Sequence, residues 1–341
     1  MPPREAHLVG SLPGPTPAAA TTTALDVLGP YLRTLPDGET GERRNWIISI
    51  IEGLREHPDL ELAQQGDWSD YDRTPRLRVR RGRRLYGAAL DLGHVAAVRE
   101  SHPQFLEVRG SRTDLRFQQG VPGDLDVAAF ALGRTGAVRS RRAFTEATLA
   151  EVRDVAALTG PGTLFQVEVP LELVMLAKAP PPVRPALARL LARGVTRLAA
   201  ATAEGTRFAV HLCLGDMNHR AYATMTDVGP LVLLAGAIIG GWPEGRPLEL
   251  VHAPFAAAER PPTTDPAFYA PLAGLRLPLD VRFAAGVAHE EQAPGDQRAV
   301  RDLVEEHLQR RVVVASACGL GRRTQDAGRA VLERTAELCE A

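Results

Sequence analysis

Short apolar runs alternate with longer amphipathic segments along almost the whole chain. Eight runs are short and apolar enough to be strands, at 6–10, 31–36, 115–119, 164–169, 207–213, 248–252, 279–287 and 311–317. The segments between them carry helical periodicity, as at 42–54, 145–158, 183–203, 297–308 and 324–338. This alternation is typical of βα units around a parallel sheet.

The order of these elements predicts an α/β fold, a single (β/α)8 barrel of the TIM type over residues 1–341. Such a barrel needs about 250 residues, so the chain has room for elaborated loops. The main excess lies at 56–113, between the second and third predicted strands, and we interpret it as an insertion holding a hairpin and a helix. A doubly wound sheet is the alternative, because alternation alone does not say whether the sheet closes.

Composition narrows the classes of partner. Hydrophobic residues make up 45% of the chain, enough for a large core, and 40 Lys and Arg against 41 Asp and Glu give a net charge of -1. No global basic field argues for nucleic acid. A local arginine cluster at 76–84 is interpreted as a solvated hairpin.

Three cysteines at wide spacing do not resemble a disulfide framework. The N-terminus shows no export signal. The longest apolar stretch, 229–242, is shorter than the roughly 20 residues of a membrane span. We therefore expect a soluble, cytoplasmic protein with no membrane contact.

The candidate chemistry begins with a His-x-Cys pair. His211 and Cys213 are two apart in one predicted strand, so they share a face, and Cys318 ends another predicted strand. Imidazole and thiolate are preferred zinc donors. The side chains of an isolated pair of this kind more often pack in the protein core. Here the third ligand at a matching strand end favours a zinc site.

Other polar residues also follow predicted strands, which is where barrel enzymes place their sites. They are Ser11, Asp37, Glu39, Glu168, His252 and His289. For Asp37, Glu39 and Arg43 the alternative is a helix N-terminus capped by Thr40. For Glu168 the alternative is a structural ion pair.

At these residues the chain resembles the C-terminal catalytic barrel of cobalamin-independent methionine synthase, which shares a barrel superfamily with uroporphyrinogen decarboxylase. The resemblance runs in order through HLVGSLP, PDGETGERRNW, FQVEVP, VHLCLGD and VVVASACGLGRRT. It implies that His211, Cys213 and Cys318 are zinc ligands. The family's remaining ligand is a glutamate on the sixth strand; here the choice is Glu249 or His252, and alignment of the strand end favours His252.

The resemblance also places Ser11, Glu39 and Glu168 around the amino-acid part of a thiol substrate. Arg43 is a further substrate-binding candidate, because a guanidinium can clamp a carboxylate. We assign catalytic roles to Glu168 and to His289, which could donate a proton. Glu168 stands where the family usually has aspartate, and His289 where it has an Asp-x-His segment.

These residues predict a zinc-dependent transferase that activates a thiol for alkyl transfer, most simply methyl transfer. The partners would be a thiol and an alkyl donor such as a folate, a corrinoid protein or another carrier. The alternatives are thiol addition to an epoxide, a metal-free lyase or decarboxylase, and a non-catalytic small-molecule-binding homologue. One barrel hosts many chemistries, so the fold does not choose among them.

Overall fold

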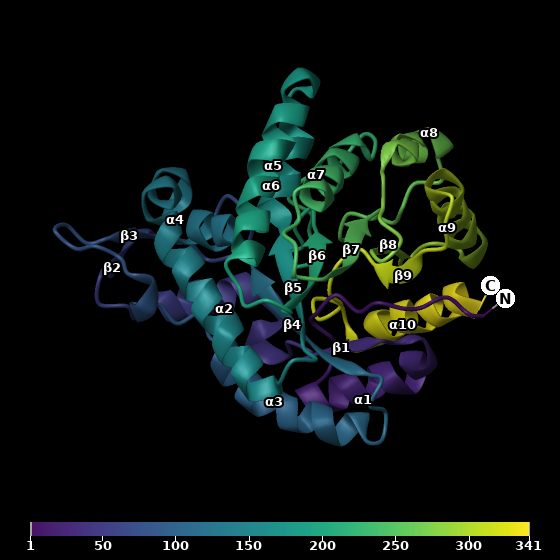
Figure 1. The fold of residues 1–341 in the computed structure, drawn as a ribbon, viewed down its shortest axis with the longest axis horizontal. Helices are drawn as coiled ribbons and strands as arrows, with labels where there is room; N and C mark the ends of the chain where they lie inside the picture. The colour runs from purple at the N-terminus through teal and green to yellow at the C-terminus, as the bar shows by residue number, and fades with distance from the viewer. Residues whose placement is uncertain (1, 341) are drawn as a thin grey trace.

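The structure, a computed structural model, describes residues 2–340. Its main feature is a curled sheet of seven parallel strands in the order β1-β4-β5-β6-β7-β8-β9 (Figure 1). The strands are β1 (Thr34–Pro36), β4 (Arg116–Pro122), β5 (Leu164–Val169), β6 (Arg207–Leu212), β7 (Leu248–Pro254), β8 (Arg282–Ala288) and β9 (Val313–Ser316). The expected α/β class is confirmed, and the curled sheet is compatible with a TIM-type barrel.

The N-terminal segment lies between the two edges of this sheet. The prediction of a full strand at 6–10 is wrong, because within that range Ala6 alone forms β-bridges, one to Leu32 and one to Val314. The amide of His7 donates to the carbonyl of Val314 over 2.9 Å. The segment thus joins β9 to the chain that enters β1.

Side chains replace the missing ladder bonds of this segment. The side-chain amide of Gln118 donates to the carbonyls of Leu8 and Val9 at 2.8 and 3.0 Å. That of Gln166 donates to the Val9 carbonyl at 2.5 Å. Buried carbonyls must be paired, so these amides from β4 and β5 allow the segment to run inside the curled sheet without regular strand hydrogen bonds.

Helices cover the outside of the curled sheet (Figure 1). They are α1 (Pro17–Leu28), α2 (Trp46–Leu54), α3 (His94–Arg109), α4 (Asp124–Thr159), α5 (Pro170–Lys178), α6 (Arg184–Ala200), α7 (Gly229–Gly240), α8 (Pro266–Tyr269), α9 (Pro294–Leu308) and α10 (Gln325–Glu340). Six begin with proline in the first two positions, where its fixed φ suits the first turn. Among residues 2–340 no helix is long and apolar enough to cross a membrane.

Several helix boundaries differ from the sequence predictions. The predicted helix at 42–54 divides into a 3₁₀ turn, η2 (Gly41–Asn45), and α2. The predicted helix at 145–158 is the second part of α4, which begins at Asp124 and kinks where Gly133 has a φ of 66°. Periodicity across such a kink changes phase, which hid the first part of the helix.

Between β1 and β4, the segment 56–113 forms a small antiparallel sheet of β2 (Leu60–Gln64) and β3 (Arg76–Val79), followed by α3. The hairpin projects from the body beside α4 (Figure 1). It packs on a separate apolar cluster with α2 and α4, centred on Ile51, Leu60 and Phe144. That this segment is an insertion stays a prediction.

The N-terminal mouth of the sheet is held by one carboxylate. Glu249 forms ion pairs with Arg116, Arg207 and Arg282, each the first residue of its strand. The Arg207 contact is 2.7 Å long. Above this layer the interior is filled by small and branched apolar side chains, among them Ala209. The site must therefore lie at the opposite, carboxyl end.

We expect Glu249→Gln to lower the free energy of unfolding by about 2 kcal/mol, because three converging guanidinium groups lose their counter-charge. Urea unfolding measures the effect. The matched control is Glu61→Gln, which removes a carboxylate from the exposed arginines Arg78 and Arg80 and should cost less than about 1 kcal/mol. Equal effects of the two variants would contradict the role assigned to Glu249.

Candidate metal centre and adjoining cavities

Three soft ligands meet at the carboxyl end of the sheet. His211 lies on β6, Cys213 follows that strand directly, and Cys318 follows β9. The Cys318 sulfur lies 3.7 Å from the Cys213 sulfur and 3.7 Å from Nε2 of His211. The three ligand atoms all lie within 4.8 Å of one another. The structure thus brings together the three residues that the sequence predicted as zinc ligands.

The spacing of these atoms fits a tetrahedral zinc ion. With Zn–S near 2.3 Å and Zn–N near 2.05 Å, tetrahedral ligands lie about 3.8 Å apart for two sulfurs and about 3.6 Å apart for nitrogen and sulfur. The observed separations of 3.7 Å are close to both values. Cys213 and Cys318 are free cysteines. The donor types, and the two separations made by Cys318, therefore fit zinc.

A chain of hydrogen bonds prepares His211 for ligation. The carbonyl of Ser316 can only accept, so Nε2 of His252 donates to it over 2.8 Å. Nδ1 of His252 then accepts from Nδ1 of His211 over 2.7 Å, which leaves the lone pair of His211 on Nε2, facing Cys318. Burial lowers the pKa of both imidazoles, that of His252 to about 4, so each ring is neutral.

Neither candidate for the fourth ligand belongs to this cluster. Glu249 lies at the opposite mouth, paired with arginines. His252 is adjacent, but both its ring nitrogens are engaged by His211 and by the Ser316 carbonyl. In this arrangement His252 orients His211, and its role as a metal ligand stays a prediction.

Arg322 adds positive charge beside the sulfurs. Its Nη2 lies 3.2 Å from the Cys318 sulfur and 3.2 Å from Oδ2 of Asp216. The pKa of the Cys318 thiol is lowered by the hydrogen bond from Cys213 and then by Arg322, whereas that hydrogen bond and burial raise the pKa of Cys213. Cys318 is therefore the more acidic of the two thiols.

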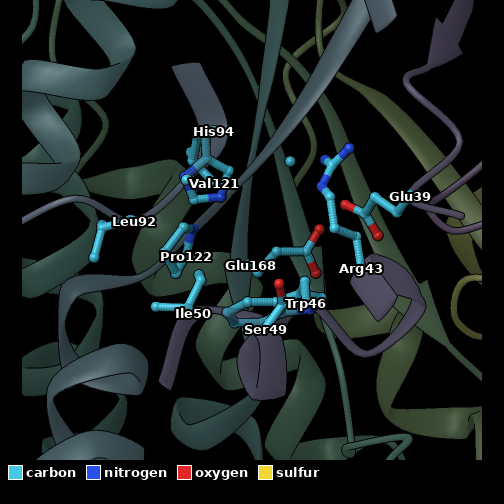
Figure 2. Close-up of a pocket in the computed structure, with 12 residues that line it drawn as sticks. Glu39, Arg43, Trp46, Ser49, Ile50, Leu92, His94, Val121, Pro122 and Glu168 are labelled. Carbon is cyan, nitrogen blue, oxygen red and sulfur yellow. The ribbon is translucent and has the colours of Figure 1, made fainter. Parts of the chain in front are cut away.

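A cavity of about 50 Å³ lies beside the cluster. Figure 2 shows the carboxylates of Glu39 and Glu168 and the guanidinium of Arg43 at this cavity, with Leu92 and Pro122 across from them. Arg43 is ion-paired with Asp37. Burial, and after it the negative charge of Asp37, raises the pKa of Glu39 to about 7. Burial, and after it the negative charge of Glu39, raises the pKa of Glu168. An ammonium group entering here would be stabilised by both carboxylates.

Two glycines make the space for Glu39. A Cβ at Gly10 would lie 3.0 Å from a Glu39 carboxylate oxygen, and a Cβ at Gly120 would lie 3.1 Å from the other. Glu39 itself has a φ of 39°, a left-handed conformation that is unfavourable for a side chain of this size. Thr40, the alternative helix cap, makes no side-chain capping bond. The backbone here is shaped to aim a carboxylate inward.

Ser11, the remaining predicted substrate-binding residue, does not line this cavity. Its hydroxyl accepts from Nη1 of Arg322 at 3.2 Å, and its carbonyl accepts from the amide of Leu320 at 2.6 Å. A Cβ at Gly319 would lie 2.4 Å from the hydroxyl oxygen. Ser11 therefore positions the turn that carries Cys318.

A second cavity, of about 60 Å³, opens over the sulfurs. Its polar lining includes Cys213, Cys318, Arg322 and Glu168, so Glu168 lines both cavities. The other walls are mainly aromatic and apolar side chains, among them Trp46, Ile47, Tyr71, Phe130 and Met217. The arrangement places an apolar entrance next to the thiols.

Tyr71 is a site residue that sequence reasoning missed. Its hydroxyl accepts from the amide of Met217 at 2.8 Å, and its ring stacks on Tyr222 with centroids 4.3 Å apart. It comes from the segment 56–113, which the sequence predicted as an insertion holding a hairpin and a helix, with no link to the site. No local signal connects it to residues almost 150 positions later.

His289 is buried but lies outside both cavity linings. Its Nε2 donates to the carbonyl of Ala258 at 3.1 Å, and its Nδ1 accepts from the amide of Glu291 at 3.2 Å. The two nitrogens are therefore bound by backbone groups of the loop after β7 and of the loop after β8. These contacts do not support the catalytic role of His289, which stays a prediction.

The fold is shared with known methyltransferases. A B12-independent methionine synthase from Shewanella sp. W3-18-1, solved in complex with selenomethionine, superposes with a TM-score of 0.58 at 13% identity, covering 99% of this chain and 96% of that one. A methyltransferase from Methanosarcina mazei superposes with a TM-score of 0.57 at 14% identity, covering 98% and 93%.

No protein-family model and no curated protein matches the sequence. At such low identity the superpositions establish the fold alone. They agree with the resemblance read from the sequence, since the structural neighbours are methionine synthase-like methyltransferases along nearly the whole chain.

The pKa of His252 predicts how stability depends on pH. Its folded-state pKa, about 4, lies below the ordinary value near 6.5, so its contribution is present above pH 6.5 and lost as pH falls towards 4. A shift of this size corresponds to about 3 kcal/mol. We expect the chelator-treated wild type to lose that much more stability between pH 7 and pH 4 than His252→Gln, measured by urea unfolding. Parallel pH profiles would contradict the assignment.

Proposed function

We propose that this protein is a zinc-dependent transferase that activates a thiol substrate for alkyl transfer, most simply methyl transfer. The observation that supports it best is the convergence of His211, Cys213 and Cys318 at the carboxyl end of the sheet, with their ligand atoms within 4.8 Å of one another. The shared fold of methionine synthase-like methyltransferases supports it at a coarser level.

His211, Cys213 and Cys318 would hold the zinc ion, which when bound supplies a cationic site where a thiol sulfur is kept as thiolate. Arg322 would stabilise the negative charge on the sulfurs, because its side chain is 6% exposed and its Nη2 lies 3.2 Å from the Cys318 sulfur. His252 would keep the proton on Nδ1 of His211 and so keep Nε2 available.

The cavity with Glu39 and Glu168 suits the ammonium group of an amino-acid thiol. Two buried carboxylates stabilise a cation there, and Arg43 offers the complementary charge for a carboxylate. The Shewanella enzyme was solved with selenomethionine, an amino acid with a selenium ether. An amino-acid thiol of the homocysteine type is therefore the substrate class that we propose.

The alkyl donor would approach through the apolar cavity over the sulfurs. That cavity, about 60 Å³, has room for a small alkyl group but not for a whole carrier. The carrier would remain outside it, whether a folate, a corrinoid protein or another donor. Addition of the thiol to an epoxide would use the same site, so the donor screen must include epoxides.

The first test is metal content by mass spectrometry of protein purified without a metal-affinity tag. We expect about one zinc per chain in the wild type and less than about a tenth of that in the Cys213→Ala, Cys318→Ala double variant. Cys339→Ala is the control, because this buried cysteine lies on α10 and contacts the carbonyl of Glu5 instead.

Zinc-loaded protein would then be mixed with amino-acid thiols and each donor class, with product mass as the readout. We expect S-alkylation that the double variant lacks and Cys339→Ala keeps. Protein that stays free of zinc after anaerobic reconstitution would refute the transferase and favour a metal-free lyase or a binding protein.

A further inference from the structure

We propose that Glu168 on β5 is the fourth zinc ligand of the resting site. This rests on the proposed zinc site and departs from the expectation that the fourth ligand comes from the strand of Glu249 and His252. Oε2 of Glu168 lies 3.5 Å from Nε2 of His211. With Zn–O and Zn–N both near 2.05 Å, tetrahedral geometry places two such ligand atoms about 3.4 Å apart.

The register of the sheet puts Glu168 at the level of the cluster. Glu168 pairs with His211 across β5 and β6, and His211 pairs with His252 across β6 and β7. The three side chains therefore lie in one row inside the curled sheet. In this row the acid on β5 faces Nε2 of His211, whereas His252 on β7 contacts Nδ1 of the same ring.

Hydrogen bonding leaves one carboxylate oxygen of Glu168 for the metal. The side-chain amide of Gln166 donates to Oε1 at 2.7 Å, and that amide also binds the Val9 carbonyl. Oε2 is the oxygen that faces His211. A ligating carboxylate commonly has its second oxygen held in this way, because the outer hydrogen bond fixes its orientation.

The other acids and imidazoles near the site are committed elsewhere. Glu249 is paired with arginines at the opposite mouth, and both nitrogens of His252 are hydrogen-bonded. Asp216 lies 3.2 Å from Nη2 of Arg322 and 3.7 Å from Nδ1 of His219. Among the described residues, Glu168 has the carboxylate whose contact with the cluster is shortest.

The charge of such a site is matched by its surroundings. Two thiolates and one carboxylate exceed the charge of Zn²⁺ by one negative unit, and the buried guanidinium of Arg322 lies against Cys318. A ligand set with His252 in place of Glu168 would be neutral and would leave Arg322 balanced by Asp216 alone. With Glu168 as the fourth ligand, the net negative charge of the metal site is therefore balanced by the buried guanidinium of Arg322.

Glu168 also lines both cavities, so this assignment has a consequence for substrate binding. A substrate sulfur that enters the metal's coordination sphere would compete with Glu168 for its place. The displaced carboxylate would still face the cavity that holds Glu39. The position of Glu168 would thus depend on whether the substrate is bound.

The test uses Co²⁺ as the probe on chelator-treated full-length protein. Chelator competition gives the affinity, and absorption spectra separate sulfur-to-cobalt charge transfer from the visible ligand-field bands. The variants are Glu168→Gln, Glu168→His and Glu39→Gln. Glu39→Gln is the matched control, since it removes a neighbouring buried carboxylate that has no contact with His211 among the described interactions.

We expect Glu168→Gln to weaken Co²⁺ binding by about 100-fold or more, beyond the usual range for residues that only orient a ligand. It should keep the charge-transfer bands of two thiolates and change the ligand-field bands. Glu168→His supplies a nitrogen of similar reach without charge and should restore most of the affinity. Glu39→Gln should change affinity less than about tenfold.

Two results would overturn the assignment. The first is that Glu168→Gln has the same Co²⁺ affinity and spectrum as Glu39→Gln. The second is that Glu168→His does not restore the affinity, because the loss in Glu168→Gln would then come from the missing charge and not from a missing ligand. Circular dichroism of each metal-free variant verifies folding, and Glu168→Asp replaces any variant that does not fold, with intermediate affinity expected. Wild type without charge-transfer bands would instead refute the proposed zinc site, a result distinct from either of these.

Discussion

The hydrogen bond between His211 and His252 is the interaction on which the candidate centre depends. Without it the proton of His211 is free to occupy either nitrogen, and the ring is free to turn. The carbonyl of Ser316 fixes the direction of the chain, because a carbonyl can only accept. Since Ser316 ends β9 and Cys318 follows it, the same turn that supplies a sulfur also sets the protonation of a ligand on β6.

Burying polar groups around the hydrogen bond between His211 and His252 costs free energy, and side-chain amides offset part of that cost by pairing with buried acceptors. Gln118 and Gln166 satisfy carbonyls of the N-terminal segment, and Gln166 also holds Glu168. Buried polar networks stabilise a fold only when each member is satisfied. Here one network serves two purposes: it fastens the segment that joins the sheet edges, and it orients an acid beside the candidate metal centre.

Local pattern was enough for the α/β class and for the meeting of His211, Cys213 and Cys318, because residues two apart on a strand share a face and parallel strands end at one edge. It was not enough for the hydrogen bonds of His252, because the partner Ser316 lies 64 positions away. It also missed that residues 6–10 form only a short bridge at Ala6, because the side-chain amides that bind this segment come from distant strands. Both features depend on long-range partners rather than on local propensity.

The glycines at positions 10 and 120 limit which substitutions the chain accepts around Glu39. A Cβ at either position would lie within 3.1 Å of a carboxylate oxygen of Glu39, so a larger residue there would force that carboxylate to shift. A substitution at either glycine would therefore act on the acid, although a glycine carries no functional group of its own. Two residues without side chains thus help to set where a charge lies in the interior.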